Sequence, residues 1–129
     1  MKDYHPTQSW RFGGFATPES TLESWAWARS RGDKTVMLQC LTPEEQKKLQ
    51  HEFTILSDEE LKTRTDGLLA KMDGYRIVKR EPVSTEEVVL HVAEMSGADQ
   101  GHSGRLVFKK YDTEWKMSEA KQIDDRVVA

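Results

Sequence analysis

The chain has a single cysteine, Cys40, among 129 residues. One cysteine cannot form an internal disulfide, so the fold must rest on a hydrophobic core rather than on covalent bridges. Cys40 lies in an apolar segment between Leu38 and Leu41. Free cysteines in such segments are mostly buried and unreactive. We therefore expect a buried thiol rather than a catalytic nucleophile.

Patterns that bind metals, phosphates or cofactors are also missing. The histidines of the chain are His5, His51, His91 and His102. Their positions do not have the spacing of metal ligands, such as i, i+4 on one helix. The tetrapeptide GHSG at residues 101–104 lacks the spacing of a nucleophile elbow, and no glycine-rich phosphate loop is present. We expect neither a metal site nor a cofactor.

Long apolar runs and an excess of basic charge are absent as well. No stretch approaches the roughly 20 apolar residues of a membrane span, and residues 1–15 lack the apolar core of a signal peptide. The formal net charge is -3, with acidic and basic residues interleaved, which gives no basic surface for nucleic acid. We expect a soluble chain. A cytoplasmic location and export with a leader missing from this chain both stay open.

The length suits one domain, because 129 residues can bury about two thirds of their unfolded surface. We expect an N-terminal extended segment at residues 1–15, a single domain at residues 16–122 and a C-terminal tail at residues 123–129.

The clearest local signals surround a tryptophan-rich helix. Thr17 is a good N-cap before Pro18, and Gly32 can stop a helix after two basic residues, which predicts a helix at residues 18–31. Leu22, Trp25, Ala26 and Arg29 form one stripe on it, whereas Trp27 projects from a different side. Trp25 fits core packing. For Trp27, core packing and ligand stacking are both kept.

Three further helices are predicted at residues 33–41, 43–56 and 57–73. The second of these begins with a capping box of Thr42 and Glu45, and the third with one of Ser57 and Glu60. Gly74 is interpreted as the terminator of the last helix.

From Tyr75 onward the apolar period falls to about two, which indicates strands. Strands are predicted at residues 75–80, 87–95, 105–111 and 115–122, and residues 96–104 are expected to form the longest exposed loop. Alternation places Val88, Leu90 and Val92 on one face of the sheet.

Several of these features resemble the nuclear-transport-factor-2-like superfamily. They are the opening TPE, a tryptophan-bearing helix that closes at Gly32 and Asp33, helices before an antiparallel meander, and a last strand begun by Trp115 after a tight turn. The chain is similar to small bacterial domains of unknown function grouped with that fold or with cystatin-like folds. The resemblance covers residues 16–122. It implies an α+β roll in which N-terminal helices pack on a curved antiparallel sheet of four to five strands and can enclose a pocket.

Members of this superfamily include isomerases, dehydratases, polyketide cyclases and noncatalytic binding or dimerisation modules. No position here matches a diagnostic catalytic motif. The prediction is therefore a noncatalytic module that binds a protein partner, itself, or a small apolar ligand between helices and sheet. A homodimer would use the sheet face that carries Val89, His91 and Val107. The predicted pocket residues are Trp25, Trp27, Phe53, Leu90, Phe108 and Trp115.

The alternative is a small lyase or isomerase of the same fold. Such an enzyme needs pocket groups that act as general acid and base. The candidates in this chain are Glu94 and Glu119, which continue apolar strand faces, and Tyr75 at the start of its strand. Whether these three side chains converge on one cavity distinguishes the two hypotheses.

Overall fold

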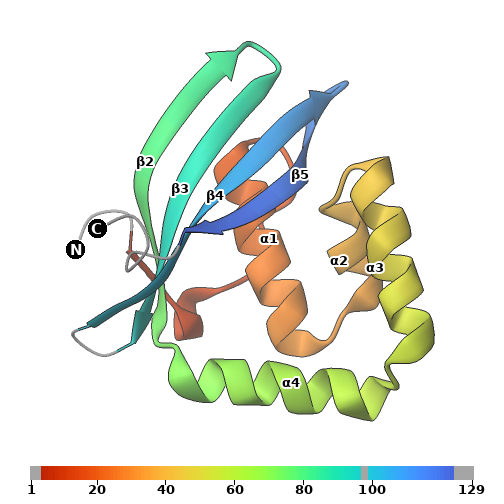
Figure 1. The fold of residues 1–129 in the computed structure, drawn as a ribbon. Helices are drawn as coiled ribbons and strands as arrows, with labels where there is room; N and C mark the ends of the chain where they lie inside the picture. The colour runs from red at the N-terminus through yellow and green to blue at the C-terminus, as the bar shows by residue number, and fades with distance from the viewer. Residues whose placement is uncertain (1–3, 97–98, 124–129) are drawn as a thin grey trace.

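A computed structural model describes residues 4–96 and 99–123, apart from the side chains of residues 68, 99–102 and 119–123. In this part of the chain, helices pack against one curled antiparallel sheet (Figure 1). The helices are α1 (Pro18–Arg31), α2 (Lys34–Gln39), α3 (Pro43–Ile55) and α4 (Asp58–Lys71), with a 3₁₀ turn, η1, at Thr7–Ser9. The strands are β1 (Tyr4–Pro6), β2 (Gly74–Ser84), β3 (Glu87–Ser96), β4 (Asp99–Tyr111) and β5 (Glu114–Ile123). The predicted α+β class is confirmed.

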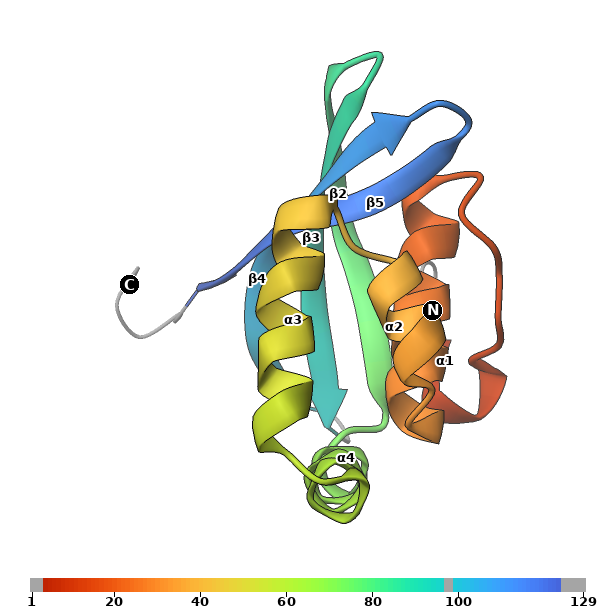
Figure 2. The same ribbon diagram turned by 90° about the vertical axis from the view of Figure 1, so that its right-hand side faces the viewer.

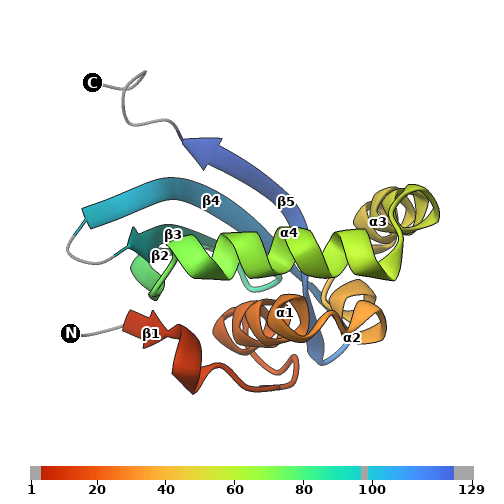
Figure 3. The ribbon, with the colours of Figure 1, turned by 90° about the horizontal axis from the view of Figure 1, so that it is seen from below.

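The five strands lie in the order in which they occur along the chain, each antiparallel to the next. The helices α1, α2 and α3 stand along the sheet, and α4 crosses one end of the fold (Figures 2 and 3). The hydrophobic core lies between these layers, and its buried members include Leu22, Leu90, Phe108 and Met117. A buried hydrogen bond from the Thr21 hydroxyl to the carbonyl oxygen of Trp115 (2.7 Å) joins α1 to β5.

The ends of α1 follow from local chemistry, as the sequence predicts. The Thr17 hydroxyl accepts a hydrogen bond from the Ser20 amide at 3.0 Å. Gly32 takes a left-handed conformation with φ of 68°, which favours glycine. The capping box at the start of α4 is also formed, because the Ser57 hydroxyl and the Glu60 carboxylate each accept the other residue's amide hydrogen.

The capping box predicted for Thr42 and Glu45 is wrong. The Thr42 side chain makes no cap hydrogen bond, and its buried hydroxyl oxygen has no hydrogen-bond partner among the described residues. The reason is a tertiary contact, since the Thr42 amide donates to the carbonyl oxygen of Met117 and Leu41 bridges to the same strand. This contact draws Thr42 to 1% exposure.

Gly74 does not end α4 in a left-handed conformation. The helix ends at Lys71, and Met72 is already extended. Gly74 instead begins β2 and pairs with Pro6 of β1. A Cβ atom at Gly74 would lie 2.4 Å from the carbonyl oxygen of His5, so glycine is needed for the close approach of β1. Residues 4–6 thus add a fifth strand to the predicted meander.

The expected long loop at residues 96–104 is wrong as well. Ser96 pairs with Asp99 and Met95 with Gln100, so β3 and β4 continue through most of that segment. Ladder hydrogen bonds use backbone groups, and a polar, glycine-rich sequence can therefore still pair.

Candidate functional site

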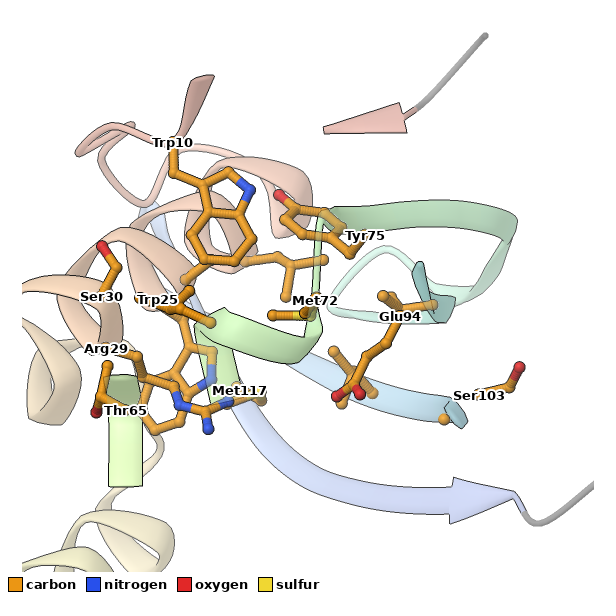
Figure 4. Close-up of a pocket in the computed structure, with 16 residues that line it drawn as sticks. Trp10, Trp25, Arg29, Ser30, Thr65, Met72, Tyr75, Glu94, Ser103 and Met117 are labelled. Atoms are coloured by element: carbon orange, nitrogen blue, oxygen red, sulfur yellow. The ribbon is translucent and has the colours of Figure 1, made fainter. Parts of the chain in front are cut away.

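A cavity of about 390 Å³ lies between α1, the C-terminal end of α4 and the strands β2 to β5. Its walls are mostly apolar, and the main side chains on them are Trp10, Leu22, Trp25, Met72, Tyr75 and Leu106. Figure 4 shows these walls around one space. Pockets of this kind, apolar with a few polar groups, are typical of small-molecule sites.

The wall from α1 is the stripe seen in the sequence. Leu22, Trp25, Ala26 and Arg29 all line the cavity, because residues three and four apart share one face of a helix. The sequence therefore indicates this wall correctly, although it does not show that the stripe borders a space rather than a filled core.

A second wall comes from the N-terminal segment. The indole Nε1 of Trp10 donates a hydrogen bond to the carbonyl oxygen of His5 (3.0 Å), and the Thr7 amide donates to that of Asp73 (2.8 Å). These bonds hold Trp10 over the cavity, with its ring centroid 5.8 Å from that of Tyr75. Trp10 is a site residue that the sequence reasoning missed. A lone tryptophan in a mostly polar segment was the signal for it.

Arg29 brings a positive charge into this apolar setting. Its guanidinium carbon lies 5.8 Å from the centre of the Trp25 ring, a cation–π arrangement. Burial lowers the pKa of Arg29, and the charge of Glu94 acts in the opposite direction. Arginine nevertheless stays protonated in proteins. The cavity thus holds a permanent cation.

Glu94 and Tyr75 face each other across the pair β2 and β3 and both line the cavity. Tyr75 is 5% exposed and its ring stacks on that of His5 at 4.9 Å. Burial, with a smaller contribution from Glu23, raises the pKa of Tyr75. Its phenol therefore stays protonated at neutral pH and can donate a hydrogen bond.

The third candidate, Glu119, lies on β5 opposite Val107. Its side chain is outside the described part of the chain. Two of the three candidate catalytic residues, Tyr75 and Glu94, thus line one cavity.

Most of the predicted pocket residues lie elsewhere. Of the six, Trp25 lines the cavity. Leu90 and Phe108 are fully buried and Trp115 is 8% exposed, and all three belong to the core. These bulky side chains fill the middle of the sheet. The cavity lies nearer the end of the sheet that carries Ser103 and Gly104, which line it.

The remaining two predicted pocket residues contact other groups. Trp27 packs edge-on against Phe12 at 6.0 Å and beneath Arg31 at 5.6 Å. Phe53 lies under the Lys34 ammonium at 5.1 Å. Neither side chain is on the cavity wall. Trp27 instead contacts Phe12 of the segment that precedes α1.

The sheet face proposed for self-association is partly covered within the chain. Val89 is 3% exposed, and Val107 is half-buried. His91 Nε2 lies 2.6 Å from Glu81 Oε1. This bond, with help from Lys79, lowers the pKa of the Glu81 carboxyl group. Because Val89 is already buried within the chain, it does not need a second copy of the protein to shield it from water.

Neither a metal site nor a membrane span is found within the described ranges. No group of three or more histidine, cysteine, aspartate or glutamate residues there could hold a metal ion. No helix there is both long enough and apolar enough to cross a bilayer.

Comparisons with known proteins support the fold and nothing finer. No protein-family model matches the chain, and no curated protein matches it. Among solved structures, it is similar to a SEC-C motif containing protein from Rhodopseudomonas palustris, with a TM-score of 0.58 and 16% sequence identity. The match covers 84% of this chain and 80% of that one. The shared class is an α+β fold with helices against a curled antiparallel sheet.

Proposed function

We propose that this chain is a noncatalytic binding module of the nuclear-transport-factor-2-like type, and that its cavity holds a small, largely apolar ligand. The observation that carries the proposal is the aromatic wall made by Trp10, Trp25 and Tyr75 around about 390 Å³ of space. Aromatic rings offer large contact areas with few rotatable bonds, so they bind planar or aliphatic groups at low entropic cost.

The size of the cavity supports the same proposal. Small-molecule sites commonly measure roughly 300 to 1,000 Å³, and this cavity falls at the lower end of that range. Its polar groups are few and separate, among them Arg29, Thr65 and Glu94. Such groups orient a ligand, whereas burial of its apolar body provides most of the affinity.

A titration with the neutral apolar dye N-phenyl-1-naphthylamine tests this proposal. Met72→Trp should fill the cavity, because Met72 lines it directly after the C-terminal end of α4. We expect the wild type to enhance dye emission and this variant to abolish the enhancement. Ile55→Trp is the matched control, since Ile55 is 67% exposed on α3 and away from the cavity. Equal dye binding by both variants would contradict the proposal.

A second candidate function has one observation in its favour, the presence of Glu94 and Tyr75 on the same cavity. In a lyase or isomerase, Glu94 would remove a proton next to a carbonyl group and the Tyr75 phenol would donate a hydrogen bond to the developing oxyanion. Incubation of a bound carbonyl compound in deuterated water tests this function. Exchange at the adjacent carbon that Glu94→Gln abolishes, with binding retained, would favour the enzyme.

A further inference from the structure

The cavity carries two opposite charges that do not neutralise each other by contact. Arg29 on α1 and Glu94 on β3 both line it, and Figure 4 shows them extending into the space from different walls. Among the described residues, no ion pair or hydrogen bond joins these two side chains. The guanidinium instead lies over Trp25.

Buried charges are normally paired, because removing a charge from water is unfavourable unless partners replace the lost solvation. Arg29 is half-buried, and burial lowers its pKa by more than the charge of Glu94 raises it. A guanidinium also presents a planar set of donors that matches a carboxylate. Arg29 therefore presents guanidinium donors to the cavity that can pair with an anion, and Glu94 presents a carboxylate there that can accept from a cationic donor.

We infer that the cavity takes an aromatic amino acid or a closely similar zwitterion, with its carboxylate on Arg29, its ammonium group on Glu94 and its ring against Trp10 and Tyr75. This inference rests on the proposed function, because it names the ligand class for the same cavity.

The balance of charge argues for a zwitterion over a simple ion. Arg29 and Glu94 are the charged side chains on the wall as far as the structure describes it, so their charges sum to zero. A lone carboxylate would be repelled by Glu94, and a lone ammonium group by Arg29. A molecule with both groups meets one opposite charge at each end and leaves the total unchanged.

The wall also suits an aromatic body. Tyr75 is stacked on His5, with ring centroids 4.9 Å apart, and is tilted against Trp10, with ring centroids 5.8 Å apart. A further ring can join such a cluster in stacked or edge-on contact. Thr65 of α4 also lines the cavity and adds a hydroxyl group near the ligand.

Four probes that share a phenyl ring test the inference. L-Phenylalanine carries both charges, and 3-phenylpropanoate carries only the negative one. 2-Phenylethylamine carries only the positive charge, and toluene carries none. Dissociation constants come from the shifts of the indole N–H signals in ¹H–¹⁵N NMR spectra. We expect L-phenylalanine to bind about 10- to 100-fold more tightly than either singly charged probe.

Charge-removing variants assign the two ends. Arg29→Gln should weaken L-phenylalanine about 10-fold or more while 2-phenylethylamine binds as well as before or better. Glu94→Gln should weaken L-phenylalanine similarly and improve 3-phenylpropanoate. Arg31→Gln is the matched control on the same helix, because Arg31 lies against Trp27 outside the cavity, and it should change none of the four affinities.

The results separate this inference from the proposed function. Equal binding of toluene and L-phenylalanine, unaffected by either charge variant, would overturn the zwitterion and leave a general apolar pocket. Failure of all four probes together with failure of the neutral dye would overturn both. Thermal unfolding of each variant, measured without ligand, excludes loss of the fold as the cause of lost binding.

Discussion

Two buried threonines contrast at the level of single residues. The Thr21 hydroxyl is fully buried and donates to the carbonyl oxygen of Trp115 at 2.7 Å. Thr42 is 1% exposed, and no residue in the described part of the chain hydrogen-bonds its hydroxyl group. The same atom type is thus satisfied at one site and unsatisfied at the other, and a buried hydroxyl without a hydrogen bond destabilises the folded state.

Replacement of each threonine by the isosteric valine should have opposite effects. Thr42→Val removes an unpaired hydroxyl and should raise the free energy of unfolding by about 1 kcal/mol. Thr21→Val leaves a buried carbonyl oxygen of Trp115 without its donor and should lower it by about 1 to 2 kcal/mol. Urea unfolding of both variants measures the two changes. A loss of stability in Thr42→Val as large as that in Thr21→Val would contradict the assignment.

Among the elements, β1 depends on one close backbone contact. Gly74→Ala would place a Cβ 2.4 Å from the His5 carbonyl oxygen, and that atom belongs to a backbone that cannot turn aside cheaply. We expect β1 to detach and the free energy of unfolding to fall by about 1 to 3 kcal/mol. Hydrogen exchange at the Thr7 amide, which donates to Asp73, should become faster.

The control for this prediction is Gly67→Ala on α4. A Cβ at Gly67 meets nothing within 4 Å, and alanine favours a helix over glycine by up to about 1 kcal/mol. This variant should be more stable than the wild type and should retain slow exchange at Thr7. Undisturbed exchange in Gly74→Ala would show that β1 does not need glycine at this position.

The helices could be predicted more closely than the sheet, and the reason is the range of the interactions. Thr17, Gly32 and Ser57 act on the nearest turn, so their effect is visible in the sequence. Gly74 is a residue type that often ends helices, but here it allows close contact with His5, about 70 residues earlier in the chain. No local sequence pattern reveals such a contact. The pairing of Ser96 with Asp99 likewise overrides a loop-like composition.

The cavity could be predicted only in part for a similar reason. The helical stripe that contains Trp25 and Arg29 gives one wall. Whether an apolar strand residue fills the core, as Leu90 does, or borders a space, as Leu106 does, depends on the position of α4 and β1. Those positions arise from tertiary packing.

For the whole molecule, buried acidic protons limit stability in alkaline solution. Burial raises the pKa of Cys40 from 9.0 to about 12, although Lys116 opposes the shift, and burial also raises the pKa of Tyr75 above its ordinary 10.0. The unfolded chain releases these protons at lower pH than the folded protein does. The stabilising contribution is therefore complete below about pH 9 and is lost as the pH rises above it.

We expect the free energy of unfolding to fall by about 1.4 kcal/mol per pH unit for each group once the pH exceeds its unfolded pKa. Urea unfolding between pH 8 and pH 11 measures this slope. Cys40→Ala should make it shallower above pH 9, and Tyr75→Phe above pH 10. Tyr111→Phe makes the same chemical change at a side chain that is 42% exposed and serves as the control. Identical slopes in all four proteins would contradict the prediction.

The hydrogen bond between Thr21 and Trp115 also has a consequence for biosynthesis. Its partners are 94 residues apart, so α1 emerges from the ribosome long before the strand that completes its packing. At about 5 to 20 residues per second, the apolar stripe of α1 waits on the order of 5 to 20 seconds for β5. During that interval Leu22 and Trp25 are available to chaperones, because α1 is the first of the described α-helices to be synthesised and waits longest for β5.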